Sequence, residues 1–299
     1  MPTSVPRVVL VERPTEYAEL LARHGTREQA RFFLETRGRS IAELDERHRR
    51  FAEGRQTVLA AIPARWRRAQ VSRADLDRFL FEPADVVAVL GQDGLVANTA
   101  KYLDGQPVVG LDPDPELHEG ELVRHHPSDA GELLDEVVTG RPRFEDRTMV
   151  EARLGDGQSL VAVNEVFVGH ESHQSARYLL RAGASEERQS SSGIVVVTGT
   201  GATGWGRSIH AERRSAIELP APTHPSLAFF VREAWPSVAS GTTLTEGVLE
   251  TSEELTAVSE MNERGTIFGD GIESDRLRFA WGEQVSIRLA TRSLRLVLG

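Results

Sequence analysis

The sequence predicts an α/β N-terminal domain followed by a β-rich C-terminal domain. The segment ADVVAVLGQDGLVANTAKYL, followed by QPVVGLD, has the pattern strand, glycine turn, helix, strand. Beyond about residue 145, short alternating apolar segments such as SLVAVNEVFVG and GTTLTEGVLET are separated by glycine and polar turns, which is typical of antiparallel strands. A chain of 299 residues is also long enough for two domains.

The N-terminal part begins with a predicted buried strand, RVVLVE at Arg7–Glu12, and two helices are expected after it. Thr26 and Ser40 each stand three residues before a Gln or a Glu, which is the capping-box spacing for a helix start. The second helix has an apolar stripe and is stopped by Pro63, and a short helix is expected at Asp75–Phe81.

The turn GQDG contains Gly91, Gln92, Asp93 and Gly94, between a predicted strand and a predicted helix. A strand, helix and strand joined by short links form a right-handed parallel crossover, and ligands bind at the carboxyl edge of such a sheet. The turn is not a Walker loop, because no GK[ST] follows. Two interpretations remain open for Asp93: it belongs to a ligand site, or it only caps the helix.

A second glycine-rich turn lies in Ser191–Ser208, where the β-branched run IVVV leads into TGTGATGW. Gly199, Gly201 and Gly204 match the spacing GxGxxG, and glycine lets the backbone turn sharply and approach a ligand. A Rossmann unit is not expected, because the candidate acidic residue Glu218 is followed by the loop sequence LPAPTHP and no strand precedes it. The turn is therefore either a nucleotide site or a glycine-rich connection in a β-rich domain.

Composition excludes several classes of function. The formal net charge of -10 argues against a nucleic-acid partner, and no apolar segment approaches the roughly 18 residues of a membrane span. The N-terminus shows no secretory leader, so a cytoplasmic location is expected. Cysteine is absent, which excludes disulfides and thiolate chemistry. No protein metal site is expected, since His170 and His173 at a strand end are not spaced to place both rings on one face.

Three motifs carry a resemblance to a known family. GQDG after a strand, NEVFVG, and TGTGATGW after another strand occur in the order of the NAD kinase family, whose motifs read GGDG, NE and TPTGSTAY. The sequence is most similar to the mitochondrial class, and REQARFFLETRG, DPDPELHEGEL and GDGIESDRLRF extend the resemblance over nearly the whole chain.

The resemblance implies an ATP-dependent NAD kinase, a phosphotransferase that moves the γ-phosphoryl group of ATP to the adenosine 2′-hydroxyl of NAD and gives NADP. Asp93 would be the general base, and Gly91, Gln92 and Gly94 would face the donor phosphates. The implied NAD-binding residues are Asn164, Glu165, Thr198, Thr200, Gly201, Thr203, Gly204, Trp205 and Ser208. Trp205 would stack near the ligand or simply pack.

The family fold implies an α/β domain with the GQDG loop at residues 1–125, a β-rich NAD-binding domain at 126–285, and a strand at 286–299 that returns to the first domain. ATP and Mg²⁺ would be the cofactors, small-molecule nucleotides the partners, and a homodimer or homotetramer the assembly. The sequence departs from the family at Gln92, which replaces the second glycine of GGDG, and at Leu95, where a small polar residue is usual.

The chemistry suits these residue types, because a ribose hydroxyl is a poor nucleophile and a positioned carboxylate is the expected proton acceptor. Two alternatives stay open. The chain is a non-catalytic NAD- or nucleotide-binding regulatory protein, or it is a kinase of this fold acting on another hydroxyl acceptor.

Overall fold

The computed structural model describes residues 5–115 and 120–299. Residues 116–119, in the middle of the DPDPELHEGEL segment, lie outside the described part. The chain divides into two compact units, one containing the residues up to Glu145 together with Arg295–Gly299, the other Asp146–Leu294. The sequence places the corresponding boundaries after residues 125 and 285.

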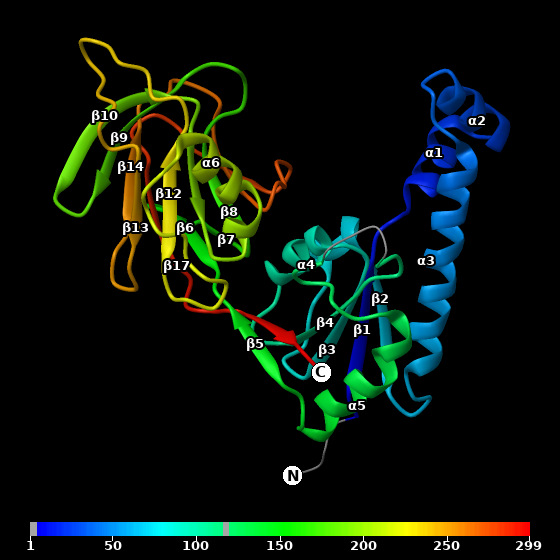
Figure 1. The fold of residues 1–299 in the computed structure, drawn as a ribbon. Coiled ribbons are helices and arrows are strands. Elements are labelled where there is room, and N and C mark those ends of the chain that lie inside the picture. The colour runs from blue at the N-terminus through cyan, green and yellow to red at the C-terminus, as the bar shows by residue number, and fades with distance from the viewer. Residues whose placement is uncertain (1–4, 116–119) are drawn as a thin grey trace. The chain divides into compact units, whose positions relative to one another are not determined.

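The first unit alternates strands and helices (Figure 1). Its elements are β1 (Arg7–Glu12), α1 (Glu16–His24), α2 (Arg27–Glu35), α3 (Ile41–Ala61), β2 (Arg67–Ser72), the 3-10 helix η1 (Arg73–Arg78), β3 (Asp85–Leu90), α4 (Asp93–Ala100), β4 (Pro107–Leu111), the 3-10 helix η2 (Pro127–Asp129), α5 (Ala130–Thr139), β5 (Phe144–Arg147) and β18 (Leu294–Val297).

These strands form one sheet in the order β2-β1-β3-β4-β18-β5. β1 pairs in parallel with both β2 and β3, and β3 with β4. The chain thus leaves β1 toward β2 and then crosses to β3 on its other side, so the strand order reverses at β1 and β3, which is where α/β sheets form ligand sites. β18 pairs in parallel with β4, so the last strand returns to this sheet as expected.

Helices cover both faces of this sheet. Val58 of α3 and Leu134 of α5 pack with Leu10, Ala88 and other strand residues in one core. α4 contacts β3, β4 and η1, and its residues from Leu95 to Ala100 are buried. The first domain is therefore the α/β layer structure that the sequence predicts.

The expected helix starts are present, with two additions. Thr26 accepts a hydrogen bond from the backbone N–H of Gln29 (3.2 Å), and Ser40 accepts one from Ala42 (3.2 Å), one residue earlier than the capping-box pattern predicts. Helix α1, which Thr15 caps, and strand β2 were not expected from the sequence. β2 is an edge strand with one buried residue, Val71, so it lacks the apolar alternation that marks a strand.

The second unit is mainly β-structure (Figure 1). Its elements are β6 (Val150–Leu154), β7 (Ser159–Ala162), β8 (Glu165–His170), β9 (Ala176–Ala182), β10 (Ser185–Ser191), β11 (Ile194–Val197), the 3-10 helix η3 (Gly201–Thr203), α6 (Trp205–Arg213), β12 (Leu227–Val231), β13 (Glu246–Leu249), β14 (Leu255–Ser259), β15 (Gly265–Gly269), β16 (Arg276–Arg278) and β17 (Gln284–Leu289).

Two antiparallel sheets make up this unit, in the orders β10-β9-β14-β17-β6-β7 and β13-β12-β11-β8-β15-β16. One apolar core joins side chains of both sheets, among them Val166 and Val196 of the second and Leu180 and Ile287 of the first. The opposite face of the second sheet carries Phe167, Val195 and Val197, which pack with Ile209 of α6. That face, with α6 on part of it, bears the candidate site residues of this unit.

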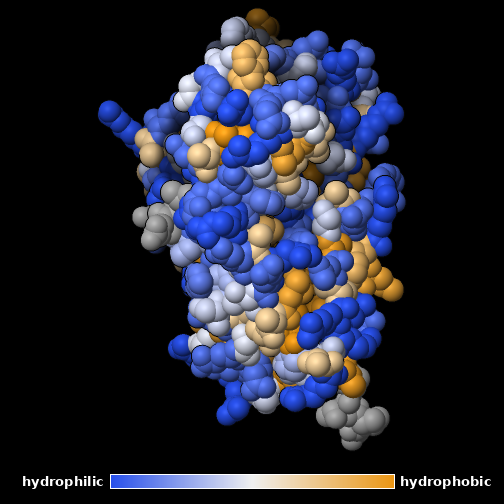
Figure 2. All heavy atoms as spheres, turned by 90° about the vertical axis from the view of Figure 1, so that its right-hand side faces the viewer, coloured by the Kyte–Doolittle hydropathy of each residue, from blue (hydrophilic) through white to orange (hydrophobic). Residues whose placement is uncertain are grey.

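The surface on the side of α1 to α3 is predominantly hydrophilic, with apolar side chains scattered in small groups (Figure 2). Along α3, Arg49 forms ion pairs with Glu46 (2.6 Å) and Glu53 (2.7 Å), one helical turn away on either side. The charged residues between the apolar positions of α3 thus form its solvated face. Within the described residues, none of the helices has the length and apolar content needed to cross a bilayer.

Candidate functional site

The GQDG turn links β3 to α4, and its structure accommodates both Gln92, which replaces the second glycine of GGDG, and Leu95, which directly follows the motif. Gly91 has φ +153°, and a Cβ there would come within 3.2 Å of the Leu95 side chain. Gln92 has φ -110° and ψ 166°, an extended conformation open to any residue, so its side chain imposes no backbone strain. Leu95 is 2% exposed and packs beneath Gly91, so it is a core residue of this turn.

Asp93 is the first residue of α4, and its carboxylate binds a second stretch of backbone. Oδ1 accepts hydrogen bonds from the N–H groups of Leu122 (2.9 Å) and Val123 (3.0 Å), and Oδ2 accepts one from Glu121 (2.8 Å). A carboxylate has about four lone-pair positions. Three are used here, and the remaining one is on Oδ2. Asp93 therefore clamps the segment 121–123 and keeps one acceptor position for a further proton donor.

The clamped segment also lies against β4. A Cβ on Gly110 would come within 2.1 Å of the carbonyl oxygen of Leu122, so only glycine permits this approach of two backbones. The backbone N–H of Asp112 donates to the carbonyl of His125 (2.8 Å), which continues the contact. The chain after residue 120 is thus fixed beside the GQDG turn.

A small cavity of ≈170 Å³ adjoins the turn, at the carboxyl ends of β1, β3 and β4. It is lined by Gly91 and Gln92, by Arg13 after β1, and by Asp112 and Asp114 after β4. Arg13 donates a hydrogen bond to the side-chain oxygen of Gln92 (3.2 Å). The cavity thus lies at the reversal of strand order and brings a cation, an amide and backbone of the glycine turn together.

In the second unit, Asn164 and Glu165 stand at the start of β8, and Asp270 holds them there. The Asp270 carboxylate accepts hydrogen bonds from the N–H groups of Val163 (3.0 Å) and Asn164 (2.7 Å), and the N–H of Asp270 donates to the Glu165 carbonyl (3.0 Å). Asp270 has φ +53°, a left-handed conformation that Asp tolerates better than most residues. The half-buried side chain of Asn164 makes no hydrogen bond with the described residues.

Thr198 shapes the glycine turn that follows β11. Its buried hydroxyl donates to the carbonyl of Val163 (2.5 Å) and accepts from the N–H groups of Thr200 (3.1 Å) and Gly201 (3.2 Å), while its own N–H donates to the carbonyl of Asn164 (2.9 Å). These bonds join the turn directly to the residues that precede β8. The NE and TGTGATGW motifs are therefore parts of one local structure.

Two of the three glycines of this turn are required for backbone packing. A Cβ on Gly199 would come within 2.0 Å of the Ala221 carbonyl oxygen, and one on Gly201 within 2.1 Å of the Asn164 carbonyl oxygen. At Gly204 the nearest atom would be 3.9 Å away. Gly199 and Gly201 thus pack against protein backbone, and Gly204 borders open space.

The remaining residues of the motif differ in accessibility. Thr200 is 3% exposed, and its hydroxyl accepts a long hydrogen bond from Arg147 (3.4 Å). Thr203 is half-buried and donates to the Thr200 carbonyl (2.8 Å), whereas Gly204 and Ser208 are exposed at the start of α6. The Trp205 ring is stacked with that of Phe167 at 6.3 Å and an interplanar angle of 18°, so it packs on the sheet with part of its surface open.

A buried pair of hydroxyl groups holds the start of β11, the strand that leads into the TGTGATGW turn. The Tyr178 hydroxyl is hydrogen-bonded to that of Ser191 (2.6 Å), which also accepts the N–H of Gly193 (2.9 Å). Burial raises the pKa of the Tyr178 phenol, so the group stays neutral and serves as an anchor.

Comparison of the whole fold with solved structures finds proteins of similar architecture. The chain superposes on yeast NADH kinase, crystallised with NADH, with a TM-score of 0.62 and 14% identity over 99% of this chain and 84% of that one. It superposes on an NAD kinase from Archaeoglobus fulgidus, crystallised with ATP, with a TM-score of 0.59 and 14% identity over 98% and 93% of the two chains. The chain has the NAD kinase fold.

Sequence comparison points the same way over shorter stretches. The chain is 34% identical to the NAD kinase of Heliobacterium modesticaldum over 132 residues, which are 42% of this chain and 46% of that protein. It is 29% identical to that of Chlorobaculum tepidum over 188 residues, 61% of each chain. Human mitochondrial NAD kinase 2 is 26% identical over 264 residues, 71% of this chain and 60% of that protein. No protein-family profile matches the chain.

These curated relatives are matched over only about half to three fifths of their length, from 46% to 61%. The bacterial NAD kinases match at identities no lower than the human mitochondrial one, so the closer likeness to the mitochondrial class remains a prediction.

One residue that builds the local structure around the NE pair, Asp270, was not assigned from the sequence. GDGIESDRLRF was noted, but an acidic residue followed by glycine is also an ordinary turn signal. The sequence also led us to interpret Gly199 and Gly201 as residues that let a ligand approach, whereas both pack against protein backbone. Among the residues the structure describes, no three His, Asp or Glu side chains are grouped to hold a metal ion.

Proposed function

We propose that this protein is an NAD kinase, which transfers the γ-phosphoryl group of ATP to the adenosine 2′-hydroxyl of NAD and gives NADP. The observation that carries the proposal is the match of 98% of the chain to a kinase solved with ATP, combined with curated relatives named NAD kinase. Two structural features support it independently. The GQDG turn lies at the reversal of strand order, and a hydrogen bond joins the TGTGATGW turn to the residues next to the NE pair.

In this proposal Asp93 is the general base. One acceptor position on Oδ2 is left by its three backbone hydrogen bonds, and a ribose hydroxyl donating to that position would give up its proton there as the phosphoryl group arrives. The clamp would fix the carboxylate orientation, because both lone pairs of Oδ1 are used.

The donor phosphates would lie at the GQDG turn. Gln92 needs no unusual backbone angle there, and Arg13 beside it supplies positive charge. Mg²⁺ would be held mainly by the ATP phosphates, which need at most one or two protein carboxylates. Asp112 and Asp114 line the adjoining cavity and are the carboxylates suited to that task.

Among the predicted NAD-binding residues, we assign direct contact with NAD to the accessible ones, and we assign to the buried ones the role of keeping the turn in its conformation. The Asn164 amide, Glu165, Thr203, Gly204, Trp205 and Ser208 are half-buried or exposed. Thr198, Thr200 and Gly201 are buried, and the hydroxyl of Thr198 is bound to backbone, so these residues would hold the turn in shape.

The test is NADP formation by the purified protein with NAD, ATP and Mg²⁺, read by an NADP-specific dehydrogenase. We expect turnover by the wild type and a fall of about 10²-fold or more in Asp93→Asn, which removes the proton acceptor. Asp77→Asn, an exposed carboxylate of η1, is the matched control and should be unchanged. Gly110→Ala disturbs the clamped segment but leaves the carboxylate, so it should lower both stability and turnover, with a smaller loss of turnover than in Asp93→Asn.

Two alternatives give different results in the same assay. If NAD raises the melting temperature but no NADP forms, the protein is a nucleotide-binding regulator without transfer activity. If ATP is consumed with other hydroxyl acceptors as readily as with NAD, the acceptor assignment is wrong. NADH belongs among the acceptors tested, since a structural neighbour was crystallised with NADH. The expected homodimer or homotetramer is tested by light scattering.

A further inference from the structure

Gln92 stands where the GGDG motif has its second glycine, and its side chain connects two segments of the first unit. The side-chain oxygen of Gln92 accepts a hydrogen bond from the Arg13 guanidinium at 3.2 Å, although the two residues are 79 positions apart. Both residues line the ≈170 Å³ cavity at the carboxyl ends of the strands. A glycine at position 92 has no side chain to make this contact, so the contact belongs to this chain and not to the motif.

The backbone of Arg13 is fixed, and its side chain is held at one point. Arg13 directly follows β1, and Pro14 after it restricts Arg13 to extended conformations. Thr15 then caps α1, and its hydroxyl is hydrogen-bonded to the His48 ring at 2.7 Å. The Arg13 side chain is exposed, and the only hydrogen bond of its guanidinium within the described residues is the one to Gln92.

Acidic side chains that line the same cavity have arginine partners of their own. Glu16 forms an ion pair with Arg39 at 2.7 Å, and Asp114 forms one with Arg50 at 2.6 Å. Arg13 forms no ion pair with any residue that the structure describes. Its positive charge therefore stays available to an anion in the cavity.

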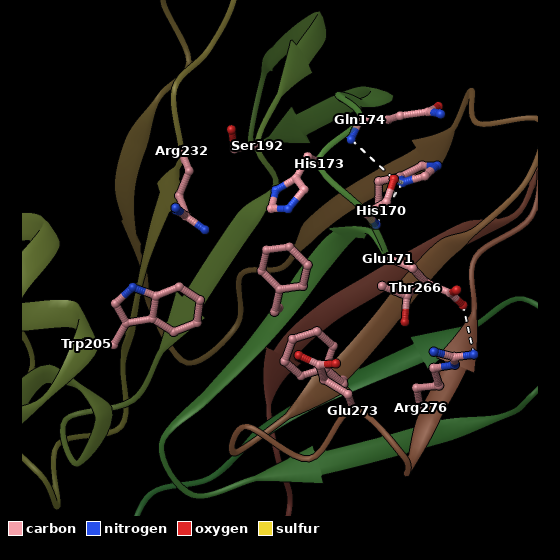
Figure 3. Close-up of a pocket in the computed structure, with 13 residues that line it drawn as sticks. His170, Glu171, His173, Gln174, Ser192, Trp205, Arg232, Thr266, Glu273 and Arg276 are labelled. Carbon is pink, nitrogen blue, oxygen red and sulfur yellow. Dashed lines mark hydrogen bonds and ion pairs between the residues drawn. The ribbon is translucent and has the colours of Figure 1, made fainter. Parts of the chain in front are cut away.

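The chemical nature of the partner decides how much charge an arginine presents. Arg276, in the second unit, forms an ion pair with Glu171 at 2.9 Å, and this carboxylate offsets much of its charge (Figure 3). An amide oxygen is a neutral acceptor, so it orients a guanidinium by a hydrogen bond and leaves the positive charge in place. Gln92 thus orients Arg13 without neutralising it.

We propose that Gln92 is a positioning residue that acts through Arg13. It holds the guanidinium at the cavity before binding, where Arg13 pairs with a phosphate of the donor nucleotide. A guanidinium suits this task because its N–H groups bind phosphate oxygens in pairs, and the only lysine of the chain, Lys101, is buried at the end of α4. The inference rests on the proposed function, because the anion is taken to be the triphosphate of ATP.

Titration calorimetry with ATP and Mg²⁺ on the purified protein tests the proposal. Arg13→Gln should weaken ATP about tenfold, because a charge-assisted hydrogen bond to phosphate is lost. Gln92→Ala should weaken it about three- to tenfold, because the Arg13 side chain then has to be ordered on binding. Gln92→Glu keeps the shape but pairs with the charge of Arg13, so it should weaken ATP at least as much as Gln92→Ala. Arg23→Gln, which removes an exposed arginine from the last turn of α1, is the matched control and should bind ATP as the wild type does.

A double-mutant cycle separates action through Arg13 from direct contact between Gln92 and the phosphates. If Gln92 acts through Arg13, Gln92→Ala should add no loss to Arg13→Gln, and the double variant should bind ATP as Arg13→Gln alone does. Inorganic tripolyphosphate, which lacks adenosine, should give the same order of variants. In turnover, Gln92→Ala should raise the KM for ATP several-fold and leave the KM for NAD unchanged.

Losses that add in the double variant, an ATP affinity unchanged in Arg13→Gln, or an equal weakening of NAD would overturn the proposal, with folding of each variant verified by urea unfolding. Binding is measured without turnover, so the expected cycle in a protein that forms no NADP would contradict the proposed function and not the role of Gln92. NADP formation with additive losses would contradict the role of Gln92 alone. A wild type that binds neither ATP nor tripolyphosphate would contradict both.

Discussion

Replacing Asp270 tests whether one side chain outside the motifs holds the NE pair in place. Its carboxylate accepts the N–H groups of Val163 and Asn164, at 3.0 and 2.7 Å, from a residue with φ +53°. A hydrogen bond to a charged group contributes about 1.5 to 3 kcal/mol, and we take the lower value for each because Asp270 is half-buried and water replaces part of the bond. The two bonds therefore stabilise the fold by about 3 kcal/mol.

The three variants separate this contribution from backbone strain. Asp270→Gly loses the bonds, about 3 kcal/mol, but removes a Cβ from the left-handed region, which returns about 1 kcal/mol, so we expect a net loss of about 2 kcal/mol. Asp270→Ala keeps a Cβ there, as the wild type does, so it should lose the full amount of about 3 kcal/mol. Asp270→Asn keeps one acceptor oxygen and should fall between the wild type and Asp270→Gly. The order of unfolding midpoints in urea should thus be wild type, Asn, Gly, Ala.

Glu263→Ala, an exposed carboxylate in the turn before β15, is the control and should stay within about 0.5 kcal/mol of the wild type. Because the bonds position Asn164, stabilisation by NAD should also weaken in Asp270→Gly. If Asp270→Ala unfolds at the wild-type urea concentration, the clamp does not stabilise this unit and our reasoning about the NE pair is refuted.

Four further outcomes are expected. Asp93→Ala should cost about 2 to 4 kcal/mol in urea unfolding, because three backbone N–H groups of segment 121–123 lose their acceptor; an unchanged midpoint would contradict the clamp. Gly201→Ala should cost about 1 to 3 kcal/mol, since its Cβ would lie 2.1 Å from a carbonyl oxygen, whereas Gly94→Ala, with open space around it, should not destabilise α4. Gln92→Gly should bring no gain in stability, because residue 92 is extended, and a higher midpoint would show strain at this position. Burial opposes ionisation of Glu187, but hydrogen bonds from Thr243, Gln189 and Leu244 outweigh it and lower the pKa of Glu187 from 4.5 to about 2. The ionised Glu187 should therefore stabilise the fold fully above pH 4.5, and this stabilisation should fall away toward pH 2. Urea unfolding midpoints measured against pH should lose that dependence in Glu187→Gln.

Local patterns in the sequence were enough to predict an α/β unit followed by a β-rich unit. The strand, turn and helix around GQDG, the caps at Thr26 and Ser40, and the alternating strands of the second unit all depend on residues close together in the chain. Such patterns reflect the backbone preferences of the residues and the regular spacing of buried side chains, and both are set by residues close together in the sequence. The return of β18 to β4 was expected from the family resemblance, since no local pattern specifies which strand it pairs with.

The tertiary structure alone decided what most of the special residues do. Asp270 meets Asn164, Gly201 meets the Asn164 carbonyl, and Phe167 lies on Gly193, in each case because the sheet brings distant segments together. A glycine needed for backbone contact and one needed for ligand approach look the same in a sequence, because both replace a Cβ with space. What fills that space is set by the path of the whole chain, and this is why the sequence could indicate a site at TGTGATGW but not separate its supporting residues from those open to a ligand.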